Sequence, residues 1–208
     1  HYPLQVDNTG SVADTFDVSV SGERWATIAP PSVGPLAAGA STNLVVTVTI
    51  PAEALFGETD TANVTVASQG EPAVSASATL TTTSNNVYGV IVTPSADRKY
   101  GEPGTTVIYA LQVTNIGNTV DTLCFGSEGN SWNVHLPTPC ITLAATSATE
   151  VSVLIDIPSS AAIGDTNTVT VIATSESDPT RSDSAVLTTE ALEWVYIYVP
   201  IVWRDYGH

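Results

Sequence analysis

Hydrophobic and polar residues alternate along many short stretches of the chain. The clearest examples are residues 44–50 and 109–113, where every second residue is Leu, Val, Ile or Tyr. A period of two predicts β-strands that bury one face and expose the other. No stretch sustains the spacing of an amphipathic helix, so we predict an all-β protein.

The sequence repeats itself at a shift of 107 positions. Residues 2–10 (YPLQVDNTG) align with residues 109–117 (YALQVTNIG), and the same shift carries Trp25 onto Trp132. No gap is needed from Tyr2 to Thr82, and roughly a third of the aligned pairs are identical. The chain therefore contains two copies of one module.

Turn-forming residues separate the predicted strands. Residues 8–10 and 115–117 tolerate positive φ, and residues 38–41 and 68–72 punctuate later strands. Short, regularly spaced strands rich in Thr, Val and Ser are typical of a β-sandwich. We predict one sandwich per copy, with a single tryptophan, Trp25 or Trp132, filling each core.

These modules resemble the immunoglobulin-like repeats of prokaryotic secreted and cell-surface proteins, of the CARDB-like kind, which are often appended to proteases and glycosidases. The resemblance rests on Asn-x-Gly-x-x-x-Asp-Thr at residues 8–15 and 115–122, the lone tryptophan, a Leu-Ala-Ala segment, and a proline before Gly57 or Gly164. It covers nearly the whole chain. It implies two tandem immunoglobulin-like sandwiches and an extracellular, cell-surface location, but no chemistry, because such modules serve as spacers, adhesins and polymer units.

The two copies differ at their start. About twenty residues precede Tyr109 in the second copy, including a predicted strand at 87–94 and a connector at 98–101, whereas the first copy enters directly at its second strand. We therefore predict modules at 1–84 and 85–190, the first lacking its first strand and exposing an unpaired edge. The expected acceptor groove consists of Tyr2, Leu4, Val6, Ala76, Ala78 and Leu80.

A strongly apolar tail, residues 191–208, follows the second copy where a third copy would begin. Residues 204–207 (RDYG) echo residues 98–101 (RKYG) at a shift of 106, so the tail corresponds to the first strand of a further module. Both of its faces are apolar, which is typical of a strand buried on two sides. The predicted donor-strand residues are Trp194, Val195, Tyr196, Ile197, Tyr198, Val199, Ile201 and Trp203.

The tail supplies what the first module lacks. About six residues join Leu187 to Trp194 and span at most roughly 20 Å, which is less than the length of a sandwich with its loops. We therefore predict that the tail enters the first module of another molecule by β-strand addition. Repeated without closure, this head-to-tail contact between identical subunits makes an extracellular filament.

Other interpretations of the tail stay open. It resembles short C-terminal apolar motifs of some bacterial surface proteins, in which case the modules are non-polymerising spacers or adhesion modules of a larger protein with an anchoring or sorting tail. The tail could instead dock on its own chain. It is too short for a transmembrane segment, which needs about 20 apolar residues. A natural chain extending before His1 would weaken the donation hypothesis.

Charge excludes one class of partner. The 208 residues include 5 Lys+Arg and 21 Asp+Glu, giving a net charge of −16. Nucleic-acid binding needs a basic footprint, so we expect no nucleic-acid partner. No basic leader precedes an apolar core, and we expect any export signal to have been removed from this form.

Two cysteines and one glycosylation sequence are consistent with an extracellular location. Cys124 and Cys140 lie in the second module, and in an exported chain we predict one disulfide between them, worth about 3 kcal/mol. Asn63 begins the single Asn-x-Thr acceptor sequence, so glycans are candidate partners at this position.

No motif points to catalysis, a cofactor or a metal. The sequence has no Gly-x-Ser-x-Gly, no His-Glu-x-x-His and no phosphate-binding glycine loop. Only His135 lies near the cysteines, and acidic residues 58–60 and 176–178 lack the oxygen spacing of a calcium loop. One sharp alternative is a copper site at His1, as in immunoglobulin-like copper monooxygenases, but the second histidine, His135, lies in the other module.

Overall fold

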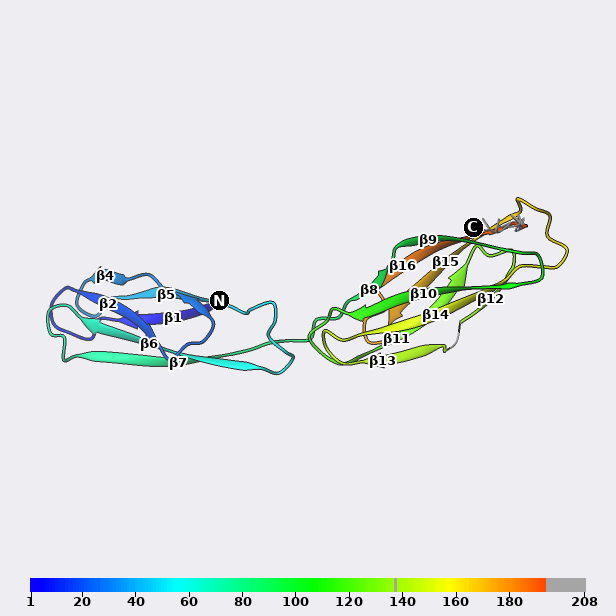
Figure 1. Ribbon diagram of the computed structural model, residues 1–208. Coiled ribbons are helices and arrows are strands. Elements are labelled where there is room, and N and C mark those ends of the chain that lie inside the picture. The colour runs from blue at the N-terminus through cyan, green and yellow to red at the C-terminus, as the bar shows by residue number, and fades with distance from the viewer. Residues whose placement is uncertain (137, 194–208) are drawn as a thin grey trace, which may run out of the picture. The chain divides into compact units, whose positions relative to one another are not determined.

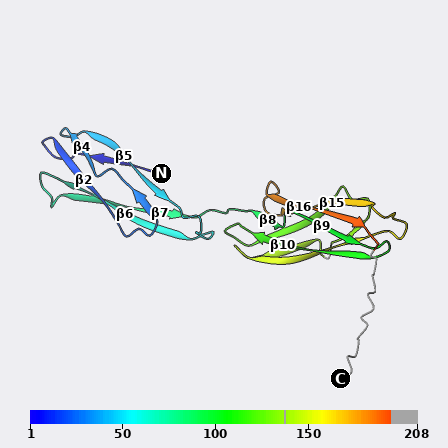
Figure 2. The ribbon, with the colours of Figure 1, turned by 45° about the horizontal axis from the view of Figure 1, so that its top comes forward.

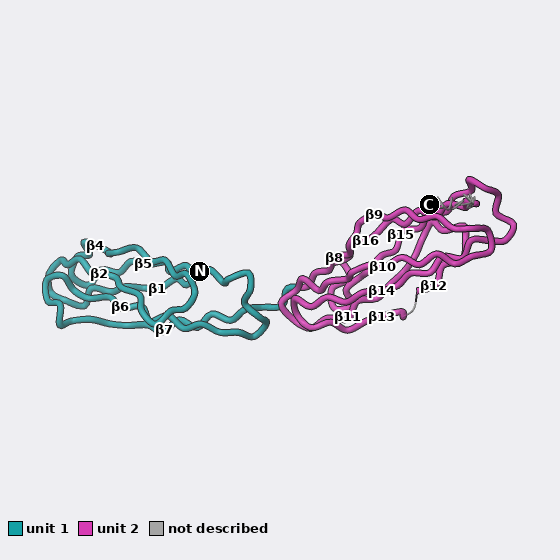
Figure 3. Tube along the Cα trace, in the orientation of Figure 1, with its two compact units in different colours: residues 1–87 teal, residues 88–208 magenta. Residues whose placement is uncertain are grey.

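The computed structural model describes residues 1–136 and 138–193, which form sixteen strands and, over those ranges, no helix. The chain divides into two compact units, residues 1–87 and residues from 88 onward (Figure 3). Each unit consists of two packed sheets, so the protein has two tandem immunoglobulin-like β-sandwiches (Figure 1). In the described part of the chain no helix is long and apolar enough to cross a membrane.

Unit 1 has seven strands in two antiparallel sheets. One sheet has the order β1-β5-β3 and the other β4-β2-β6-β7. The strands are β1 (Tyr2–Asp7), β2 (Asp14–Ser21), β3 (Ala26–Ile28), β4 (Ser32–Leu36), β5 (Ser41–Thr49), β6 (Thr59–Ser68) and β7 (Ser75–Thr83).

Unit 2 has nine strands. Its sheets have the orders β12-β14-β10-β8 and β13-β11-β15-β16-β9. The strands are β8 (Val90–Thr93), β9 (Ala96–Gly101), β10 (Thr106–Asn115), β11 (Asp121–Glu128), β12 (Asn133–His135), β13 (Cys140–Leu143), β14 (Ala148–Asp156), β15 (Thr166–Ser175) and β16 (Ser182–Ala191).

The seven strands of unit 1 correspond in order to β10–β16 at the shift of 107 positions, and β8 and β9 are the additional pair. The prediction of one strand followed by a connector was wrong in detail, because residues 96–101 form a second strand. β8 pairs antiparallel with β10, and β9 pairs parallel with β16 (Figure 2). The segment therefore adds one strand to each sheet.

The two cores differ in size. Seventeen buried apolar residues form the core cluster of unit 2, against six in unit 1, namely Val6, Leu44, Val46, Ala62, Val64 and Leu80. The prediction that a tryptophan fills each core was wrong: Trp25 is buried but is not part of the six-residue cluster, and Trp132 is half-buried and packs against the cluster of unit 2. The smaller core belongs to unit 1, where no strand among the described residues corresponds to β8 or β9.

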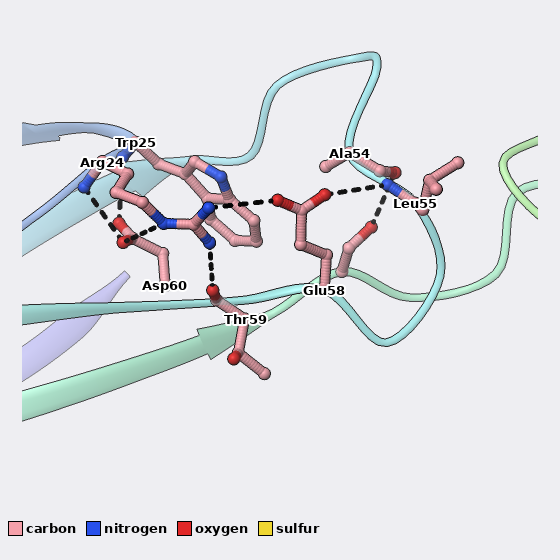
Figure 4. Close-up of polar contacts among 8 residues, drawn as sticks. Arg24, Trp25, Ala54, Leu55, Glu58, Thr59 and Asp60 are labelled. Carbon is pink, nitrogen blue, oxygen red and sulfur yellow. Dashed lines mark hydrogen bonds and ion pairs between the residues drawn. The ribbon is translucent and has the colours of Figure 1, made fainter.

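A carboxylate and an amide hold the tryptophan segment in the two units. Asp60 on β6 accepts hydrogen bonds from the backbone N–H groups of Arg24 (3.0 Å) and Trp25 (2.9 Å), as Figure 4 shows. At the equivalent position Asn167 accepts from the N–H groups of Ser131 and Trp132. Burial tends to raise the pKa of Asp60, but the backbone hydrogen bonds outweigh burial and hold the pKa below its ordinary value of 3.8.

We predict that Asp60→Asn reduces the acid sensitivity of unit 1. A folded-state pKa below the unfolded value means that ionised Asp60 contributes stability that is fully present above pH 3.8 and is lost as the pH falls through the lowered pKa. Urea unfolding between pH 2.5 and pH 6, followed by the NMR signal of the Trp25 indole, measures this. Exposed Glu23→Gln is the control and should retain the parent pH dependence; an equal response of both variants contradicts the assignment.

Candidate functional site

An open groove lies between β1 and β7 in unit 1. Its volume is about 800 Å³, and β1, the turn at residues 8–13, the start of β2, β6 and β7 contribute to its walls. The walls are mainly apolar because alternate residues of these strands face the space between the two sheets. Apolar side chains in the lining include Leu4, Val6, Phe16, Val66, Ala76 and Ala78.

The structure brings together four of the six residues that were expected to form an acceptor groove. Leu4, Val6, Ala76 and Ala78 line the groove. Tyr2 and Leu80 lie on the same two strands outside the lining. The expected donor strand at residues 194–203 lies outside the described residues.

Unit 2 shows what covers the same position in a filled sandwich. Val90 and Val92 of β8 are 6% and 3% exposed, and Leu111 and Ala185 of the same core cluster are fully buried. In unit 1 the equivalent residues, Leu4 and Ala78, are only half-buried. Ala76, which also lines the groove, is exposed. The groove thus occupies the position that β8 fills in the other copy.

The strands on either side of the groove, β1 and β7, each have one edge that pairs with no other described strand. One edge of β1 pairs with β5 and one edge of β7 pairs with β6. Within residues 1–136 and 138–193, no strand pairs with their other edges. The equivalent edges of β10 and β16 pair with β8 and β9. The groove can therefore offer both hydrogen-bonding edges and apolar side chains to an added strand.

A tyrosine ties the two sheets together beside the groove. The Tyr2 hydroxyl donates to the Thr81 carbonyl oxygen (2.6 Å) and lies 2.9 Å from Thr82 Oγ1. Tyr109 makes the same contacts with Thr188 and Thr189 in unit 2. Burial raises the pKa of Tyr109. Tyr2 was expected to line the groove. Its hydrogen bonds give it a different role, which is to set the separation of β1 and β7.

Two polar residues fix the opposite end of the groove. Asn8 Nδ2 donates to the carbonyl oxygens of Val12 and Leu36 at 2.8 Å, and Asn115 makes the equivalent pair of bonds. Asp14 accepts hydrogen bonds from the Ser68 hydroxyl and Gly70 N–H. The bond from Ser68 is the main reason that the pKa of Asp14 lies below its ordinary value. Residues 8–10 are turn-forming by residue type, but the bonds of the Asn8 side chain to distant carbonyl groups do not follow from that pattern.

The disulfide predicted from the sequence is confirmed. Cys124 and Cys140 are directly opposite each other on β11 and β13, with 4.0 Å between their Cα atoms and an S–S bond of 2.09 Å. A structural disulfide is typical of proteins that reside in an oxidising compartment, so it indicates an extracellular protein. Asn63, the candidate glycosylation site, is exposed on β6.

The histidines of the copper hypothesis lie in different units. His1 Nδ1 is 2.9 Å from Thr47 Oγ1, and His135 Nε2 is 2.7 Å from Asp156 Oδ2. Among the described residues, no group of three or more His, Cys, Asp or Glu side chains could hold a metal ion.

Parts of this chain are similar to known proteins. A family model described as a Peptidase M6-like domain matches residues 116–191, inside unit 2. No curated protein matches the sequence. Among solved structures, PapD-like domain 7 of human CEP192 is similar at 16% identity and a TM-score of 0.41, covering 51% of this chain and 87% of that chain.

Two further solved structures are similar to this chain. A protein of unknown function from Porphyromonas gingivalis W83 is similar at 12% identity and a TM-score of 0.35, over 90% of both chains. The chaperone-tip adhesion subunit complex of Csu pili from Acinetobacter baumannii is similar at 12% identity and a TM-score of 0.36, over 49% of this chain and 56% of that chain. At these identities and TM-scores the similarity supports no argument about function. The narrower resemblance to CARDB-like repeats stays a prediction.

We predict that removing the tyrosine hydroxyl costs unit 2 more than unit 1. Tyr109→Phe should lower the free energy of unfolding by about 1 to 2 kcal/mol, because the hydroxyl and Thr189 Oγ1 are buried. Tyr2→Phe should cost less than about 1 kcal/mol, because water can replace the hydroxyl beside an open groove. Urea unfolding of both variants tests this, and an equal cost would argue against the difference in solvent access.

Proposed function

We propose that this protein is a non-enzymatic structural subunit of an extracellular filament, in which the C-terminal segment of one molecule completes the first sandwich of the next. The observation that carries the proposal is the groove between β1 and β7, which lies where unit 2 places β8. The apolar segment at residues 194–203 is the proposed occupant.

Addition of a strand would satisfy both the unpaired strand edges and the exposed apolar side chains of the groove. An added strand supplies backbone hydrogen bonds to exposed edges, and its alternate side chains fill apolar space. Burying half of the ten large apolar side chains of the tail, at about 1.5 to 3 kcal/mol each, contributes on the order of 10 kcal/mol before the cost of ordering the chain. A joint of this strength is long-lived.

The contact is heterologous, because the donating and accepting surfaces are different parts of the molecule. Repetition of a heterologous contact without closure gives an open polymer. The disulfide supports an extracellular location. A cell-surface filament with glycans at Asn63 is part of the proposal, and identical subunits are the proposed partners.

We predict that removing the tail abolishes assembly. A chain ending at Glu193 should remain monomeric, whereas the intact chain should form polymers that resist salt and detergent. The cut belongs after Glu193 because Ala191 is fully buried and the Leu192 N–H donates to the Gly101 carbonyl oxygen (2.8 Å). Electron microscopy and light scattering measure the difference.

The same measurement separates the proposal from the alternative of spacer modules with an anchoring or sorting tail. In that case the intact chain and the chain ending at Glu193 are both monomeric in solution. Monomers of the intact chain, or polymers of the shortened one, contradict the filament proposal.

We predict that Ala78→Arg blocks assembly while Thr79→Arg does not. Ala78 lines the groove, and a charged side chain there occupies the space of the incoming strand and opposes its burial. Thr79 is the next residue of β7 and is exposed on the opposite face, so it is a matched control for charge and strand propensity. Sedimentation of the two full-length variants should give monomers for Ala78→Arg and polymers for Thr79→Arg; polymers from both exclude the groove as the joint.

A further inference from the structure

In unit 2, β8 and β9 occupy the position of the groove and show how a segment can fill it. We call this arrangement the template. Residues 88–101 run first along β10 as β8 and then along β16 as β9, with Pro94 between the two strands. Strands β10 and β16 are the equivalents of β1 and β7, which form the groove of unit 1. Any segment that occupies the groove in the same way has to pair with both sheets.

The tail aligns with this template without a gap. At a shift of 106 positions, residues 88–101 (YGVIVTPSADRKYG) match residues 194–207 (WVYIYVPIVWRDYG) at five of fourteen positions. The identical residues include the proline between the two strands, at positions 94 and 200, and the closing Tyr-Gly pair, at 100–101 and 206–207. The tail therefore corresponds to β8 and β9 together, and not to a single strand.

Gly101, the last residue of β9, lies where a larger residue would clash with the core. A Cβ atom on Gly101 would lie 2.9 Å from Ile157 Cδ1 and 2.9 Å from Val107 Cγ2. Ile157 is 2% exposed under this cover, whereas its equivalent in unit 1, Ile50, is 40% exposed. Gly207 of an incoming tail would allow the same close approach over Ile50.

The tail has larger side chains than β8 at the core-facing positions, and the groove wall has an apolar residue where unit 2 has a carboxylate. Val90 and Val92 face the core of unit 2, and the aligned residues of the tail are Tyr196 and Tyr198. Asp183 of unit 2 accepts a hydrogen bond from the Val92 N–H (2.8 Å), and Ala76 takes its place in the groove wall. Loss of that carboxylate leaves room and apolar surface for an aromatic ring.

Two polar contacts of β9 have no equivalent in this alignment. Arg98 forms an ion pair with Glu190 (2.5 Å), but Thr83 stands at the equivalent of Glu190. Lys99 lies over the Tyr109 ring at 5.1 Å, but Asp205 aligns with Lys99. The side chains of Arg98 and Lys99 are 52% and 40% exposed, and charged side chains this exposed gain little from an ion pair or a cation–π contact. The apolar side chains and the backbone therefore decide the fit.

We propose that residues 194–207 of a second copy bind the groove in the β8–β9 arrangement, pairing antiparallel with β1 through residues 196–199 and parallel with β7 through residues 202–207. This inference rests on the proposed function and adds its register. The template pairs Thr93 with Gln112 and Arg98 with Thr188. Transfer of these pairs onto unit 1 places Val199 opposite Gln5 and Arg204 opposite Thr81.

Cysteine pairs test this register in the full-length chain. A protein carrying Gln5→Cys is mixed with one carrying Val199→Cys, and Thr81→Cys is mixed with Arg204→Cys, each before assembly and under mild oxidation. Gln5 and Thr81 are exposed, so the substitutions leave the core intact. Each matched mixture should give a covalent dimer on a non-reducing gel, with at least a tenfold higher yield than the slipped mixtures Gln5→Cys with Ile197→Cys and Thr81→Cys with Val202→Cys.

The outcomes separate the register from the filament itself. Polymers whose slipped pairs cross-link as well as the matched pairs overturn the register and leave the filament proposal standing. Cross-linking of only the Gln5 pair overturns the two-sheet arrangement. Absence of polymers and of all dimers overturns both proposals. A chain carrying both Gln5→Cys and Val199→Cys should give a covalent ladder, and a closed monomer instead would show that the tail binds its own chain.

Discussion

The organisation of this protein depends on how the backbone groups at the edges of its sheets find hydrogen-bond partners. A β-sandwich buries apolar side chains only where both of its sheets extend over them, and each sheet ends at a strand whose outer backbone groups need a partner or water. In unit 2, β8 and β9 supply that partner to both sheets and enclose a core of seventeen buried residues. In unit 1 the same two edges border an open groove. The difference between the copies is therefore one segment rather than a different fold.

The strand pattern and the repeat were predictable because both follow from short-range periodicity. Alternation over residues such as Leu44, Val46 and Val48 depends only on which side of a strand faces the core. The pairing of Cys124 with Cys140 followed from their number and from the expected compartment. The position of the groove could be inferred because the copies are out of phase, and Leu4 and Ala78 line it.

The remaining features depend on contacts between residues far apart in the sequence. Residues 96–101 include three consecutive charged residues and lack an apolar alternation, so their pairing with β16 was missed; the pairing depends on the free edge of β16. Tyr2 was expected in the groove wall together with Leu4 and Val6, whereas its hydroxyl bonds to β7 across 79 positions of sequence. Asp60 and Asn167 hold equivalent backbone segments with different charges, a substitution that no pattern of hydrophobicity reveals.

The location of the disulfide has a thermodynamic consequence for the two units. Cys124 and Cys140 constrain the unfolded state of unit 2 within one molecule, so their contribution does not depend on how much protein is present. A sandwich completed by a segment from a neighbour is instead stabilised by mass action, in proportion to the logarithm of the neighbour's concentration. Under the proposed assembly, unit 1 gains its full stability only in the company of other subunits, while unit 2 is equally stable when the molecule is alone.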